Sequence, residues 1–282
     1  MLGLTTTPRS RQVTVAGCTV HVLEWGRDGD PALLLLHGGM AHARWWDPVA
    51  DRLADRVHVF AADLPGHGDS PWIEPQRYGE VELPVIAGLV DALASGPCTV
   101  GGHSNGGLLA VLAATDGVPV GRLVLVDIPL EPATPALLRS GQGFRRMPQP
   151  CWATRDEAVA AFRLYPRDGD PPADVLRHVA VHSIREREDG GWTSKFDWRY
   201  FRGRDPEAPS PYRGFQERLT RIPCPTLVIR GGRSAIQNAA DHAEIVARIP
   251  DARGALVPGA GHNPHVERPN ETAAAIAQFV AR

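Results

Sequence analysis

Residues 98–114 read Cys-Thr-Val-Gly-Gly-His-Ser-Asn-Gly-Gly-Leu-Leu-Ala-Val-Leu-Ala-Ala, a strand-like run that passes through a serine flanked by glycines into an apolar helical run. Gly102 and Gly106 stand two residues before and two residues after Ser104. A strand that turns sharply into a helix needs small residues there, because the two backbones approach closely. The pattern predicts a strained turn that presents Ser104 as a nucleophile. A structural glycine-rich turn and a phosphate-binding loop are the alternatives, although the loop has no Walker lysine.

Short β-branched or leucine-rich runs recur along the chain and alternate with helical patterns. Strands are predicted at 12–15, 19–24, 32–37, 57–63, 98–103, 122–127, 225–230 and 254–258, and helices at 45–53, 81–94, 106–114, 239–248 and 270–282. Most of these strands lack polar alternation, which is typical of strands covered on both faces. The order predicts an α/β fold with a mostly parallel central sheet and helices on both faces.

The segment 129–225 shows no clear strand and holds 13 of the 26 prolines. A structureless connection of this length is unusual in a compact domain. We therefore expect an inserted, mainly helical lid over the carboxyl edge of the sheet, with short helices at 155–164 and 173–187. The predicted domains are an α/β core of 1–128 and 221–282 and a lid of 129–220.

Composition limits the classes of partner. The chain has 282 residues, 43% of them hydrophobic, and a net charge of −2, so it can form a core without disulfides and has no electrostatic footprint for nucleic acid or an anionic membrane. No apolar run approaches the ~20 residues of a membrane helix, no secretory signal is visible, and the four cysteines lack CxxC spacing. We expect a cytoplasmic protein that acts on a small-molecule substrate, without nucleic-acid or membrane partners; a homodimer stays open.

A second glycine-rich turn, His37-Gly38-Gly39-Met40, follows the leucine strand. Backbone amides in a tight turn can receive the negative charge that acyl transfer places on an oxygen. One oxyanion donor would be the Asn105 N–H, next to the nucleophile. The other would be the Gly39 N–H, with the Met40 N–H as the alternative.

The last predicted strand leads into Gly259-Ala260-Gly261-His262. A general base must reach the sheet edge that carries the nucleophile, and a histidine late in the chain fits the order serine, acid, histidine. We predict His262 as the base, with His265 as the alternative.

Taken jointly, these segments resemble the α/β-hydrolase fold superfamily, in its lid-bearing branch of serine esterases, C–C hydrolases and haloalkane dehalogenases. The matching stretches are 35–40, the loop Asp63-Leu64-Pro65-Gly66-His67-Gly68-Asp69-Ser70, 100–107, 123–128, 225–232 and 257–269. The resemblance implies Ser104 as nucleophile and His262 as base. Dehalogenases and epoxide hydrolases of this fold carry aspartate at the turn, whereas serine implies an acyl-enzyme.

The acid of the triad is missing from the position where relatives usually carry it, just after the penultimate predicted strand. There the chain reads Arg230-Gly231-Gly232-Arg233-Ser234-Ala235-Ile236, which places Ala235, or Ser234 after a one-residue shift, at the acid position. In some members of the branch the acid ends the strand before the lid, where this chain has Asp127. We predict that Asp127 hydrogen-bonds His262; a cap on the lid entry is the alternative.

The predicted function is a serine hydrolase that cleaves a small or medium apolar ester, lactone or thioester through an acyl-enzyme on Ser104, without metal or cofactor. Met40, Trp45, Trp152 and Trp192 are candidate substrate-binding residues, with aromatic packing as the alternative role for Trp45. Two other functions stay open. One is non-ester chemistry, such as C–C bond hydrolysis or a cyclase or lyase step, and the other is non-catalytic ligand binding.

Overall fold

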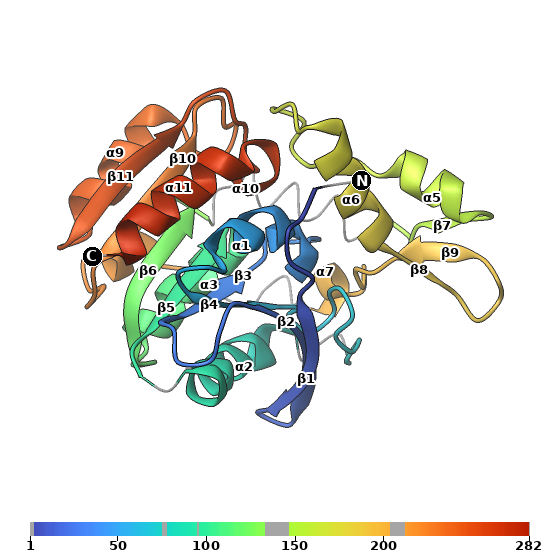
Figure 1. The fold of residues 1–282 in the computed structure, drawn as a ribbon, viewed down its shortest axis with the longest axis horizontal. Helices are drawn as coiled ribbons and strands as arrows, with labels where there is room; N and C mark the ends of the chain where they lie inside the picture. The colour runs from blue at the N-terminus through green and yellow to red at the C-terminus, as the bar shows by residue number, and fades with distance from the viewer. Residues whose placement is uncertain (1–2, 75–77, 95, 133–146, 204–211, 282) are drawn as a thin grey trace.

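The computed structural model describes residues 3–74, 78–94, 96–132, 147–203 and 212–281. Its centre is an eight-stranded sheet in the order β1-β2-β4-β3-β5-β6-β10-β11 (Figure 1). The strands are β1 Arg9–Val15, β2 Cys18–Trp25, β3 Ala32–Leu36, β4 His58–Ala62, β5 Cys98–His103, β6 Val120–Val126, β10 Thr226–Gly231 and β11 Ala252–Val257. Strand β2 pairs antiparallel with β1 and β4, and every other pair is parallel. All eight predicted strands are present, with small shifts at their ends.

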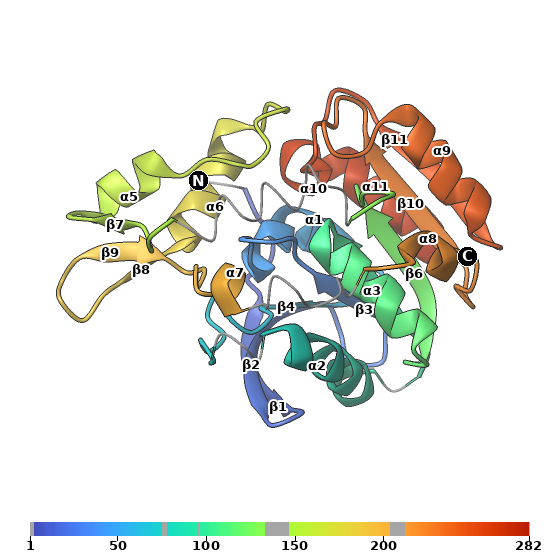
Figure 2. The same cartoon turned by 180° about the vertical axis from the view of Figure 1, so that it is seen from behind.

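Helices cover both faces of this sheet, as predicted. They are η1 Ala43–Trp46, α1 Asp47–Leu53, α2 Tyr78–Leu93, α3 Asn105–Thr115, α8 Phe215–Leu219, α9 Ala239–Arg248, α10 Pro264–Glu267 and α11 Pro269–Val280. Leu34 and Leu36 of β3 pack in the core beneath α2 and α3, while Leu33 and Leu35 pack in the core beneath α1 and α11 (Figures 1 and 2). Each successive leucine thus enters a different core, which explains the absence of polar alternation.

The insertion contains a small sheet as well as helices. Its described elements are β7 Cys151–Trp152, α5 Arg155–Ala161, α6 Ala173–His182, β8 Ile184–Glu186, β9 Trp192–Ser194 and α7 Tyr200–Gly203. The prediction of a strandless segment, and of one helix over 173–187, was wrong. Helix α6 ends at His182, and β8 and β9 form a hairpin closed by an Arg187 N–H to Gly191 O bond of 2.7 Å, with Gly190 at φ +81°. The turn signal is the run Asp189-Gly190-Gly191, which favours left-handed backbone.

Apolar side chains attach the insertion to the core domain. Leu164, Val175 and Val179 pack against Trp45 of η1 and Val266 of α10. The insertion therefore lies against the segments that follow β3 and β11, at the carboxyl edge of the sheet. Among the described residues, no helix combines the length and apolar character that crossing a bilayer requires.

Candidate active site

Ser104 occupies the turn between β5 and α3 in a conformation that non-glycine residues rarely adopt, with φ +49° and ψ −119°. Such a conformation costs about 1–3 kcal/mol and persists only where the surroundings enforce it. Here the Ser104 N–H donates to Val126 O at 3.0 Å, and the Leu108 N–H donates to Ser104 O at 3.0 Å. Strand β6 and helix α3 thus fix the turn from both sides.

The two glycines that flank Ser104 are required by close backbone contact. A methyl group at Gly102 would collide with the backbone of Gly106. A methyl group at Gly106 would come within 2.5 Å of His37 O. The spacing that the sequence displays is therefore a packing requirement of this turn.

The predicted oxyanion turn lies against the nucleophile turn. A methyl group at Gly38 would stand 3.4 Å from Ser104 Cβ and 2.6 Å from His103 Nδ1, so the two turns are neighbours. Gly39 follows directly, and Met40 has φ +60°. Asn105 is the first residue of α3, where backbone amides have no partner within the helix.

The hydrogen bond predicted between Asp127 and His262 is present. His262 Nδ1 lies 2.8 Å from Asp127 Oδ1, and the Asp127 carboxylate is fully buried. The backbone of Asp127 also has positive φ, +49°, and its N–H donates to Ile229 O at 2.8 Å. This arrangement leaves Nε2 of His262 as the nitrogen for exchanging a proton with a nucleophile.

The loop that lacks the usual acid holds Asp127 instead. Ser234 Oγ donates to Asp127 Oδ1 at 2.5 Å, and the Gly231 N–H donates to Oδ2 at 2.7 Å. Ser234 Oγ in turn accepts the N–H groups of Ile236 at 3.1 Å and Gln237 at 3.0 Å. Since both N–H groups point at the oxygen, its single proton is committed to Asp127. The sequence placed Ala235, or Ser234 after a one-residue shift, at the acid position and did not predict this role for Ser234.

A second histidine supports the backbone of His262. His103, directly before Ser104, donates from Nε2 to His262 O at 2.8 Å. Burial lowers the pKa of His103 far below its usual value, so the ring is neutral and its orientation is set by this bond. The sequence analysis did not predict a role for His103, although its position next to Ser104 in the glycine-rich motif indicated that it lies near the site.

His265, the alternative base, lies on α10 and makes no hydrogen bond to Asp127. Its ring lies 4.4 Å from the rings of Trp46 and His103 between centroids. Neither ring nitrogen has a hydrogen-bond partner within the described part of the chain. Burial lowers the pKa of His265 to about 3, which indicates a neutral packing residue.

The predicted substrate-binding residues lie in three different places. Trp45 is 5% exposed and packs against Phe162, in the cluster that attaches the insertion. Trp152 and Trp192 pair across β7 and β9, at the end of the insertion distant from the central sheet (Figure 1). Met40 packs beside the buried rings of Phe196 and Tyr200, which were not predicted from the sequence. Ile73, Trp198 and Phe201 pack against the same rings.

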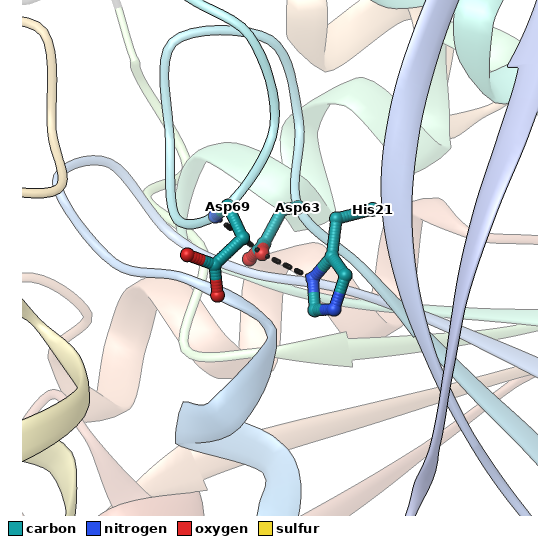
Figure 3. Close-up of side chains that lie close together, drawn as sticks. All are labelled: His21, Asp63 and Asp69. Atoms are coloured by element: carbon teal, nitrogen blue, oxygen red, sulfur yellow. Dashed lines mark hydrogen bonds and ion pairs between the residues drawn. The ribbon is translucent and has the colours of Figure 1, made fainter.

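A network around Asp63 braces the loop that leads toward this cluster (Figure 3). Asp63 accepts hydrogen bonds from His21 Nδ1 at 2.7 Å, the Ala43 N–H at 2.6 Å and the Asp69 N–H at 2.9 Å. Burial by itself raises the pKa of Asp63, but the His21 bond and the nearby His42 ring outweigh it, and the pKa falls well below its usual value. His21, Asp63 and Asp69 have the residue types of a cation site, yet protein donors already use both Asp63 oxygens, so the group is structural.

Comparison with known proteins agrees with this geometry. The sequence model of the Alpha/beta hydrolase family matches residues 33–275. The chain belongs to the alpha/beta hydrolase family. The fold class and the resemblance stated from the sequence are thereby confirmed.

Its relatives within the family carry the names of hydrolases. The chain is 32% identical over 269 residues to esterase Rv0045c of Mycobacterium tuberculosis (strain ATCC 25618 / H37Rv), covering 89% of this chain and 82% of that protein. It is 30% identical over 280 residues to 2-(acetamidomethylene)succinate hydrolase of Mesorhizobium japonicum (strain LMG 29417 / CECT 9101 / MAFF 303099), covering 96% and 95%. The crystal structure of E-2-(acetamidomethylene)succinate hydrolase superposes with a TM-score of 0.78 at 26% identity, covering 98% of this chain and 100% of that chain. These names support a hydrolase.

Proposed function

We propose that the protein is a serine hydrolase that cleaves a small or medium apolar ester, lactone or thioester through an acyl-enzyme on Ser104. In this proposal Ser104 attacks the carbonyl carbon, and His262 takes the hydroxyl proton and gives it to the leaving group. Asp127 orients the imidazole and stabilises its cation. Water then attacks the acyl-enzyme by the same route in reverse. The observation that carries the proposal is the hydrogen bond from His262 Nδ1 to the buried Asp127 carboxylate.

The oxyanion would be held by two backbone amides. Asn105 offers an N–H at the start of α3, and Gly39 offers one from the turn that lies against Ser104. Such preorganised donors stabilise the negative charge of the tetrahedral intermediate without reorganisation. Because all these groups belong to the chain, the proposed mechanism uses no metal or cofactor.

An apolar substrate is favoured by the surroundings of the oxyanion turn. Met40 follows the proposed donor Gly39 and packs with Phe196 and Tyr200. His67 lies against Phe196, with ring centroids 4.8 Å apart, and burial lowers its pKa to about 3, so it adds no charge. We therefore expect the part of the substrate near Met40 to be aliphatic or aromatic.

Labelling with a fluorophosphonate tests the nucleophile. The wild-type protein should become labelled and Ser104→Ala should not, whereas a non-catalytic binder would leave both unlabelled. Chromogenic esters of increasing acyl length, run beside lactones and thioesters, then define the substrate class. No labelling and no turnover across the panel would reject the proposal.

Cleavage of an acetamido group is the second candidate function. It is favoured by the relative named 2-(acetamidomethylene)succinate hydrolase, which aligns over nearly the whole of both chains. An acyl-enzyme on Ser104 would serve this reaction too, so acetamido compounds belong in the same panel. The missing acid after Arg230 no longer favours C–C, cyclase or lyase chemistry, because Asp127 contacts the base.

We also propose a cytoplasmic location, supported by the state of the cysteines. Cys18, Cys98, Cys151 and Cys224 form no disulfide bonds. Burial raises the pKa of Cys98 and of Cys224 to about 11, which keeps both protonated and unreactive. Free thiols are the rule in a reducing compartment, and localisation of a tagged protein would test the assignment.

A further inference from the structure

The loop between α5 and α6 brings a carboxylate from the insertion to the base. Both oxygens of Asp168 lie 3.1 Å from the backbone N of His262, and Oδ2 also accepts the Ala235 N–H at 2.7 Å. His262 belongs to the loop after β11 and Ala235 to the loop after β10. One side chain of the insertion therefore bridges the loop that presents the base and the loop that holds its acid.

Asp168 completes a set of contacts that fixes the backbone around the base. The Gly261 and Asn263 N–H groups donate to Glu267 at 2.6 Å and 3.2 Å. The His262 N–H, between them, donates to Asp168, and the His262 carbonyl accepts from His103. The N–H groups of three successive residues thus donate to carboxylates. The carboxylate that accepts from His262 belongs to the insertion.

Arginines from the core hold the Asp168 loop in this place. Arg233 Nη2 donates to Asp168 O at 3.1 Å and to Asp170 Oδ2 at 3.0 Å, and Arg268 Nη1 donates to Asp170 O at 2.9 Å. Between the two aspartates, a methyl group on Gly169 would collide with the Glu267 carboxylate. The loop of residues 168–170 is therefore packed closely enough against the loop of His262 that a shift of the insertion would shift His262.

We propose that Asp168 is a positioning residue for His262, so that the base is set for proton transfer when the insertion is seated on the core. The inference rests on the proposed function. Asp168 contacts the backbone of His262 and not its ring, which is held by Asp127, so it acts through the orientation of the base. A displaced catalytic group loses rate steeply, since a misplacement of about 1 Å can cost roughly 10²-fold.

The test compares Asp168→Ala, Asp168→Asn and the control Asp174→Ala. Asp174 is an exposed carboxylate in the first turn of α6 in the same insertion, and it accepts the Val175 N–H at 3.0 Å. In Asp168→Ala, kcat for a chromogenic ester and the rate of fluorophosphonate labelling should fall about 10- to 100-fold, with KM changed far less. Asp168→Asn should give intermediate rates, because its amide oxygen can accept one of the two N–H groups. Asp174→Ala should match the wild type.

Three outcomes separate the inference from its alternatives. A folded Asp168→Ala protein that labels at the wild-type rate overturns it. A loss in which KM rises as much as kcat falls, with a lower melting temperature and no recovery in Asp168→Asn, assigns a merely structural role and also overturns it. A wild-type protein that neither labels nor turns over substrate rejects the proposed function itself, which the variants alone cannot do.

Discussion

Asp127 and His262 lie 135 residues apart in the chain, and their side chains meet at 2.8 Å. Strand β6 delivers Asp127, the first residue beyond its end, and the loop after β11 delivers His262. A carboxylate is stable in the interior only when donors satisfy it. His262 supplies one donor, and Ser234 with the Gly231 N–H supplies two more. The loop after β10 therefore carries no acid of its own and instead supplies two hydrogen-bond donors to Asp127.

Replacing Asp127 by asparagine tests the acid. We expect ester turnover to fall on the order of 10⁴-fold with little change in KM, because the amide neither stabilises the imidazolium nor selects the required tautomer. Initial rates on the best chromogenic ester provide the measurement, and the exposed Asp55→Asn provides a matched control. If Asp127→Asn retains full activity, Asp127 is not the acid.

Restoring a carboxylate at the usual position should give no gain. The Ala235 N–H already binds Asp168 Oδ2 at 2.7 Å, so an aspartate at 235 places a second negative charge beside Asp168. We expect Ala235→Asp to be no faster than the wild type, and we expect it not to rescue Asp127→Asn in the double variant. Steady-state rates of the four proteins decide this. A large increase in either background would show that position 235 can hold the acid.

Ser234→Ala removes the hydroxyl that donates to Asp127, and it leaves the part-buried Ile236 N–H and the buried Gln237 N–H without their acceptor. We expect kcat to fall about tenfold, by analogy with other residues that orient a catalytic group, and the free energy of unfolding to fall by about 1–3 kcal/mol. Urea denaturation and ester kinetics measure the two effects. Ser183→Ala is the control, because this buried serine has its own bonds to Val179 and His42 and should lose stability without the drop in kcat.

Local sequence patterns were sufficient to predict the strands of the central sheet and the turn that contains Ser104. The leucines of β3 enter two cores in alternation, so the strand is apolar throughout, as expected of a strand covered on both faces. The glycines around Ser104 meet backbone atoms of nearby segments, which leaves a fixed spacing in the sequence. Asp127 was predicted from the resemblance to members of the branch whose acid ends the strand before the lid, and its side chain does contact His262.

The supporting residues could not be predicted, since their roles depend on contacts between loops. Ser234, His103 and Asp168 are common residue types that act on Asp127 or on the backbone of His262. The strands of the insertion have only two or three residues each, too few for a hydrophobic period to be recognised. Aromatic content likewise does not say which rings of an insertion pack beside Met40. For this reason Phe196 and Tyr200 were missed.

Gly106→Ala tests the backbone contact beside the Ser104 turn. The added methyl group would come within 2.5 Å of His37 O, so the turn or the neighbouring strand end must shift. We expect a loss of about 1–3 kcal/mol in the free energy of unfolding, as for other overpacked sites, together with a strong loss of fluorophosphonate labelling. Gly96→Ala is the control, because open space surrounds that position. Equal labelling of the two variants would contradict the close contact.

Buried histidines should make stability depend on pH. Burial lowers the pKa of His67 and of His265 to about 3, from an ordinary value of 6.5. Between these values the unfolded chain binds protons that the folded protein does not bind. The free energy of unfolding is therefore fully retained above pH 6.5, and it falls as the pH drops through the window, by about 1.4 kcal/mol per pH unit for each histidine.

His265→Phe isolates one of these contributions. Phenylalanine preserves a ring against Trp46 and His103, and it removes two ring nitrogens that find no partner among the described residues. We expect the variant to fold, and we expect its free energy of unfolding to fall less steeply than that of the wild type between pH 6 and pH 4, by about 1.4 kcal/mol per pH unit. Urea denaturation at half-unit pH steps measures both slopes. Parallel slopes would show that the His265 ring is protonated equally in the folded and unfolded chains, and would remove it from the acid sensitivity of the fold.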